Sequence, residues 1–72
     1  MIHIQTQKFY EKQTGNAHEV TILFGGISPV SNGMYEVDID GEWDSYHKRK
    51  HGAFNRITYL IKENDWSPVN HN

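Results

Sequence analysis

The stretch from Met34 to His47 constrains the fold of this chain most strongly, because its sequence is that of a β-hairpin. Apolar and acidic residues alternate strictly from Tyr35 to Ile39, and this period of two is typical of a strand with one buried face. The Asp40-Gly41 pair that follows is a strong signal for a tight turn between antiparallel strands. We therefore predict two strands joined at this turn, with their apolar face toward a core.

Two registers are open for this hairpin. A two-residue loop, Asp40-Gly41, sets Ile39 opposite Glu42, whereas a three-residue loop that includes Glu42 sets Ile39 opposite Trp43. We favour the three-residue loop, because it buries Trp43 with the aliphatic side chains and leaves the carboxylates together on the other face. The other opposed pairs in this register are Val37 with Ser45 and Asp38 with Asp44.

The rest of the chain supplies two more strands and one helix. Residues Ile2–Tyr10 and Glu19–Gly25 have the sequence character of strands, and we expect the second to be the central strand of the sheet. The Gly25–Gly33 stretch is rich in glycine, proline and serine, which predicts a long loop. From Ala53 the apolar residues follow helical spacing over about twelve residues, and Asn64 is the expected left-handed cap.

These elements predict an α+β fold in which one carboxy-terminal helix packs on one face of an antiparallel three- to four-stranded sheet, in the order β-β-β-β-α. A chain of 72 residues that is 36% hydrophobic has apolar side chains for one core, so we expect residues 1–72 to form a single small domain. The predicted core packs the hairpin against the helix through Tyr35, Val37, Ile39 and Trp43 on one side and Phe54, Ile57, Leu60 and Ile61 on the other.

The composition indicates the class of protein. The absence of cysteine excludes disulfide bonds and thiolate metal sites. Residues Met1–Tyr10 lack the continuous apolar run of a signal peptide, and the longest apolar stretch, around Ile22–Phe24, is far shorter than the roughly 18 residues that span a bilayer. We therefore expect a cytoplasmic chain without a membrane partner.

Charge is segregated along the chain, although 7 Lys and Arg against 9 Asp and Glu leave a net charge of only −2. Five carboxylates fall at every second position of the hairpin, namely Glu36, Asp38, Asp40, Glu42 and Asp44. Alternate residues of a strand lie roughly 6.5 to 7 Å apart, close to the repeat of phosphates along a nucleic-acid strand. The row is either a solvated outer face or a docking surface for another protein with a basic surface.

In size and negative charge the chain resembles the small acidic inhibitors made by bacteriophages, among them anti-restriction and anti-CRISPR proteins. This resemblance implies a phage- or mobile-element-encoded inhibitor that binds a host protein through the acidic hairpin. Our leading hypothesis is therefore a small non-enzymatic interaction protein, with the five hairpin carboxylates as its binding residues.

A basic run supports an alternative hypothesis, a nucleic-acid-binding module. The run lies before the helix and continues along its polar side, as Lys48, Arg49, Lys50, Arg56 and Lys62. A sheet followed by a helix also resembles the DNA-binding modules of integrase arms and plant AP2 domains. Those sheets present arginine and lysine to DNA, whereas the sheet predicted here presents Glu36, Asp38 and Asp44.

Other chemistry has weaker signals. The hairpin nearly matches a calcium loop, but His47 stands where a bidentate glutamate is required. His47 and His51 have the i, i+4 spacing of zinc ligands, but three basic residues separate them. We expect no metal, no cofactor and no enzymatic activity, and we assign no role to His18. The amino-terminal strand is a candidate free edge, so a homodimer is the remaining partner hypothesis.

Overall fold

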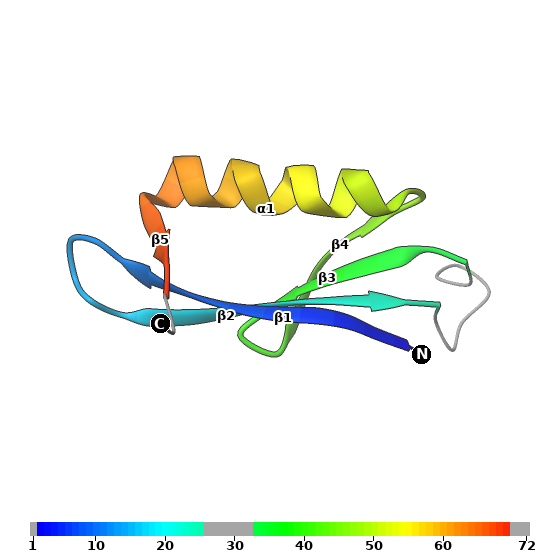
Figure 1. The fold of residues 1–72 in the computed structure, drawn as a ribbon, viewed down its shortest axis with the longest axis horizontal. Helices are drawn as coiled ribbons and strands as arrows, with labels where there is room; N and C mark the ends of the chain where they lie inside the picture. Colours follow the sequence, from blue (N-terminus) through cyan, green and yellow to red (C-terminus); the bar gives the residue numbers. More distant parts are fainter. Residues whose placement is uncertain (1, 26–32, 70–72) are drawn as a thin grey trace.

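The computed structural model describes residues 2–25 and 33–69, and in it one helix lies across one face of an antiparallel sheet (Figure 1). The order of the strands in the sheet is β4-β3-β2-β1-β5, so β2 is the central strand, as predicted. The α+β class is confirmed, with five strands rather than three to four. The elements are β1 (Ile2–Glu11), β2 (Ala17–Phe24), β3 (Tyr35–Ile39), β4 (Glu42–His47), α1 (Lys50–Asn64) and β5 (Trp66–Pro68).

The fifth strand exists because of the way α1 ends. Asp65 takes a left-handed conformation (φ 54°), and its backbone N–H donates to the carbonyl of Ile61. This turn reverses the chain, so that Trp66 pairs with Glu11 at the edge of β1. The left-handed cap therefore lies one residue beyond the predicted Asn64, and β5 covers part of an edge that the sequence left open.

The core lies between the sheet and α1. Its buried residues come from every layer, as Phe9, Val20, Ile22, Val37, Ala53, Ile57, Leu60 and Trp66. The predicted contributions of Tyr35, Val37 and Ile39 from β3 and of the four apolar residues of α1 are confirmed. Trp43 is an error of the prediction, because 59% of its surface is exposed. Among the described residues, no helix has the length and apolar character that crossing a bilayer requires.

A β-bulge in β1 corrects the predicted alternation of the first strand. The pairing with β2 shifts by one residue between His3 and Gln5, which leaves Ile4 as the extra residue. The shift lets both Ile4 and Phe9 pack toward the core, although they have opposite parity in the sequence. Thr6, which the sequence places on the same face as Ile4, lies instead on the other face and contacts Thr21 at 3.1 Å between hydroxyl oxygens.

The β3–β4 hairpin has the register that we did not favour. Its loop contains only Asp40 and Gly41, and Ile39 stands opposite Glu42. Both loop residues have positive φ, 55° and 83°, which is the conformation of the tight turn that matches strand twist. A bulge at Asp44 then absorbs one residue, so that Val37 stands opposite Ser45, as predicted, while Asp38 stands opposite Trp43.

The predicted loop at 25–33 lies largely outside the described residues, and only its ends are seen. The backbone N–H of Gly25 donates to the carbonyl of Met34 at 3.0 Å, which joins the end of β2 to the start of β3.

We expect Ile22→Val to lower the free energy of unfolding by about 1 kcal/mol, because it removes one methylene from a fully buried site of the central strand. Ile2→Val is the matched control, since 61% of Ile2 is exposed, and it should change stability by less than about 0.5 kcal/mol. Urea unfolding of both variants measures the difference. Equal losses would show that the described core is not the one that stabilises the fold.

Candidate functional site

The sheet has one face covered by α1 and one face, the outer face, on which no described element packs (Figure 1). Directly opposed residues of neighbouring antiparallel strands point to the same side of a sheet. Asp38 is opposed by Trp43 on β4 and Thr21 on β2, and none of the three belongs to the core. The next row of the outer face consists of Tyr46, Glu36 and Leu23, on β4, β3 and β2 respectively.

An aromatic pair, Trp43 and Tyr46, stands on the outer face at the edge strand β4. The two ring centroids lie 5.4 Å apart with 55° between the ring planes. Residues three apart in a regular strand point to opposite faces, but the bulge at Asp44 brings both rings to one side. The result is an exposed aromatic surface, since 59% of Trp43 is accessible.

An acid pair, Glu36 and Asp38, lies beside the aromatic pair on β3. A hydrogen bond with Asp38 is the main cause that raises the pKa of Glu36 to about 7, and burial and the charge of Asp38 act in the same direction. Glu36 therefore binds a proton up to near neutral pH, because its ionised form would place a second negative charge beside Asp38. The Oδ1 atom of Asp38 is buried and has no hydrogen-bond partner among the described residues.

The other three hairpin carboxylates lie elsewhere, so the predicted row of five does not form one surface. Asp44 points toward α1, where it accepts from Arg56 Nε at 2.8 Å and from Arg56 Nη2 at 2.9 Å. This fork of hydrogen bonds lowers the pKa of Asp44 below its usual range. Glu42 is exposed beside the turn and pairs in register with Ile39, and Asp40 contacts His18.

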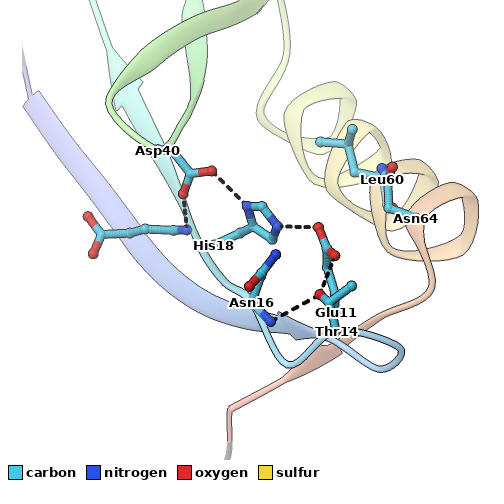
Figure 2. Close-up of polar contacts among 8 residues, drawn as sticks. Glu11, Thr14, Asn16, His18, Asp40, Leu60 and Asn64 are labelled. Carbon is cyan, nitrogen blue, oxygen red and sulfur yellow. Dashed lines mark hydrogen bonds and ion pairs between the residues drawn. The ribbon is translucent and has the colours of Figure 1, made fainter.

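His18 forms a clamp with two carboxylates, which we name the His18 clamp (Figure 2). Its Nδ1 lies 2.7 Å from Oδ2 of Asp40, and its Nε2 lies 2.7 Å from Oε1 of Glu11. Its ring stacks on Trp66 with centroids 4.7 Å apart. Each carboxylate has a second donor, because Thr14 Oγ1 donates to Glu11 at 2.6 Å and the Glu19 N–H donates to Asp40 at 2.8 Å.

The protonation state of the clamp follows from these contacts. Hydrogen bonds to Asp40 and then to Glu11 raise the pKa of His18, whereas hydrogen bonds from Thr14 and His18 lower the pKa of Glu11. Hydrogen bonds from His18 and from the Glu19 N–H also lower the pKa of Asp40. Two ionised acceptors on both ring nitrogens require both nitrogens to carry a proton, so His18 is an imidazolium. It has no free nitrogen for a substrate or a metal ion, and the cluster acts as an ion bridge.

A serine and a histidine also meet on β4. Ser45 Oγ lies 2.8 Å from Nε2 of His47, but the neighbouring Asp44 accepts from Ser45 rather than from His47. A catalytic triad needs its acid on the far nitrogen of the histidine, so this order of contacts does not make one. Among the described residues, no cluster of three or more His, Cys, Asp or Glu side chains could hold a metal ion.

The basic residues of the alternative hypothesis are spread over α1 and the bend before it. Lys48, Arg49 and Lys50 are exposed at the junction of β4 and α1. Arg56 is engaged with Asp44, and Lys62 lies in the last turn of α1, about 18 Å from Lys50 along the helix axis. Lys48, Arg49 and Lys50 therefore lie together, whereas Arg56 and Lys62 lie apart from them along α1.

Sequence reasoning missed the aromatic pair and the His18 clamp. The Asp-Gly dipeptide was a usable signal for the two-residue turn, and that turn would have placed Trp43 on the outer face. No local signal pointed to His18, because its partners lie 7 and 22 residues away in the chain.

We expect Asp44→Ala to lower the free energy of unfolding by about 1.5 to 3 kcal/mol, because it leaves the half-buried Arg56 without its acceptor. Glu42→Ala, on the same strand but exposed, should change stability by less than about 0.5 kcal/mol. Chemical unfolding at neutral pH measures both values. The stabilisation from Asp44 should also disappear in acid, since a carboxyl group with a lowered pKa contributes only above that pKa. An equal and small effect of the two substitutions would contradict the ion pair.

Comparisons of the chain with protein-family models, with curated proteins and with solved structures found no match. The function must therefore be argued from the geometry of the described residues.

Proposed function

We propose that this protein is a small non-enzymatic interaction protein that docks on a basic surface of another protein through its outer face. One observation carries the proposal: within residues 2–25 and 33–69 no cation pairs with the acid pair, which lies directly beside the aromatic pair and its exposed Trp43. The other partly buried carboxylates of the described residues have one, since Asp44 meets Arg56 and Glu11 meets His18.

The acid pair and the aromatic pair together suit an arginine or lysine side chain of a partner. A carboxylate accepts two parallel hydrogen bonds from a guanidinium, and an indole ring attracts a cation placed over its face. Asp38 and Trp43 stand opposite each other, so one bound cation can contact both.

Binding rather than catalysis is supported by the state of the polar clusters. The His18 clamp uses both ring nitrogens internally, and Asp44 is neutralised by Arg56. Inhibition of a host protein is the form of docking that we propose, because it is the role of the small acidic bacteriophage proteins that the chain resembles in size and charge.

Nucleic-acid binding is the competing outcome. The exposed run Lys48, Arg49 and Lys50 supplies positive charge, but the acid pair on the outer face repels phosphate. The observations therefore favour a basic protein as the partner.

Affinity capture tests the proposal. The protein is immobilised, a nuclease-treated cell extract is passed over it, and the retained proteins are measured by quantitative mass spectrometry. We expect Trp43→Ala and the double variant Glu36→Gln/Asp38→Asn each to lose the same basic protein. The control is Tyr59→Ala, which alters an equally exposed aromatic residue, 53% accessible, on α1 rather than on the outer face. Direct titration with the purified partner should then show at least a tenfold weaker dissociation constant for both outer-face variants, or about 1.4 kcal/mol.

Two results would end the proposal. One is a partner that is retained equally by wild type, Trp43→Ala and the double carboxamide variant. The other is retention of nucleic acid that depends on Lys48, Arg49 and Lys50 and falls with salt, which would establish the alternative.

A further inference from the structure

A different part of the molecule, the His18 clamp, connects three segments that are distant in the sequence. Glu11 is the last residue of β1, His18 belongs to β2, and Asp40 is in the β3–β4 turn (Figure 2). The stacking of His18 on Trp66 adds β5 to the same cluster. These contacts bring the four segments together, away from the end of the sheet where Gly25 is bonded to Met34.

The attachment of β5 to the rest of the sheet is otherwise slight. Within the part of the chain that the structure describes, it pairs with β1 through Trp66, Ser67 and Pro68, and the Val69 N–H adds one hydrogen bond to the Lys8 carbonyl at 3.0 Å. Proline contributes no N–H to the pairing. Trp66 is the anchor of the strand, since it is buried against Phe9 with ring centroids 5.8 Å apart.

We propose that His18 is a pH-sensitive latch that holds β5 on the edge of β1 while its ring is a cation and loosens β5 when the ring loses a proton. The reason is the number of N–H groups that the imidazole ring carries in each protonation state. A neutral imidazole has one N–H, so it can donate to Asp40 or to Glu11 but not to both. The nitrogen that loses its proton then presents a lone pair to an ionised carboxylate 2.7 Å away, which is repulsive.

Of the two hydrogen bonds, the one between His18 and Glu11 is lost when the ring is neutral. Asp40 is fixed by a second hydrogen bond from the backbone N–H of Glu19, whereas the second partner of Glu11 is only the exposed hydroxyl of Thr14. Glu11 stands opposite Trp66 in the pairing of β1 with β5. Loss of the contact between His18 and Glu11 therefore weakens the pairing between β1 and β5 at Glu11 and Trp66.

Two other charged groups near the latch, Lys12 and Asp65, pair with each other. Lys12 Nζ lies 3.4 Å from Oδ1 of Asp65, and the Lys12 N–H donates to the Asp65 carbonyl at 3.3 Å. This contact keeps the start of β5 near the β1–β2 turn. The polar side chain that α1 brings to this end is Asn64, whose amide donates to the Leu60 carbonyl (Figure 2) and has no charge to lose. The expected motion is thus a loosening of residues 66–69 about a fixed Asp65.

The direction of the pH effect follows from linkage. A histidine whose pKa is raised in the folded state stabilises that state fully below the unfolded pKa of about 6.5. This stabilisation is lost as the pH rises through the folded pKa. With one linked proton, the equilibrium between held and loosened β5 changes by up to about tenfold per pH unit in that range.

Amide hydrogen exchange by NMR tests the latch between pH 6 and 9, with rates corrected for intrinsic base catalysis. We expect the protection of the Val69 amide to fall as the ring of His18 titrates, with the same midpoint as its ring ¹⁵N shifts. The Gly25 amide, bonded to Met34 at the opposite end of the sheet, is the internal control and should keep its protection. Protection of Val69 that stays constant while His18 titrates would overturn the proposal.

Two variants sharpen the test. In His18→Gln the Val69 amide should be poorly protected at every pH, whereas the matched His47→Gln, which alters the contact with Ser45 on β4, should behave as wild type. If His18→Gln fails to fold, Glu11→Gln keeps the ring and replaces the anion by an amide that can donate to the deprotonated nitrogen. The Val69 amide of Glu11→Gln should therefore stay protected to higher pH than in wild type. A midpoint unchanged by Glu11→Gln would also overturn the latch.

Discussion

The two-residue turn at Asp40 and Gly41 is the constraint on which the rest of the molecule depends. Its two positive φ angles allow the tight connection that the twist of the flanking strands requires. The backbone of Asp40 donates to the Glu19 carbonyl at 2.8 Å, and its side chain accepts from the Glu19 N–H at the same distance. A backbone hydrogen bond and a side-chain hydrogen bond thereby connect the turn to β2. These bonds fix the register of β3 and β4 relative to the central strand.

The bulge at Asp44 modifies that register in the second half of β4. The two-residue turn alone sets Trp43 opposite Asp38 on the outer face and places Asp44 on the side of α1, where it meets Arg56. The extra residue at Asp44 then reverses the residues that follow, so that Tyr46 joins Trp43 on the outer face. The carboxylates of the hairpin therefore have different surroundings: Asp40 and Asp44 connect elements of the fold, whereas Glu36 and Asp38 meet no cation among the residues that the structure describes.

How much of this could be predicted from the sequence depends on the range of the interactions. Alternation and helical spacing identified four strands, the helix and the contributions of Val37 and Ile57 to the core, because these signals are local. Bulges are poorly encoded in local patterns, and the two at Ile4 and Asp44 each reversed the parity of the residues that follow. The clamp depended on the packing of β5, a strand of three residues, so no pattern in the neighbourhood of His18 could predict it.

Glu36 of the acid pair and His18 of the clamp both have a raised pKa, and they lie on opposite faces of the sheet. On the outer face the acid pair gains a negative charge as the pH rises through about 7, since Glu36 then releases its proton. On the helix side the His18 clamp loses its positive charge as the pH rises through the pKa of His18, which hydrogen bonds with Asp40 and Glu11 raise above the ordinary histidine value. Both changes make the chain more anionic, so a basic partner on the outer face would favour the deprotonated acid pair and by reciprocity lower its pKa. Since the clamp shares no contact with the acid pair, docking on the outer face and loosening of β5 should respond to pH independently.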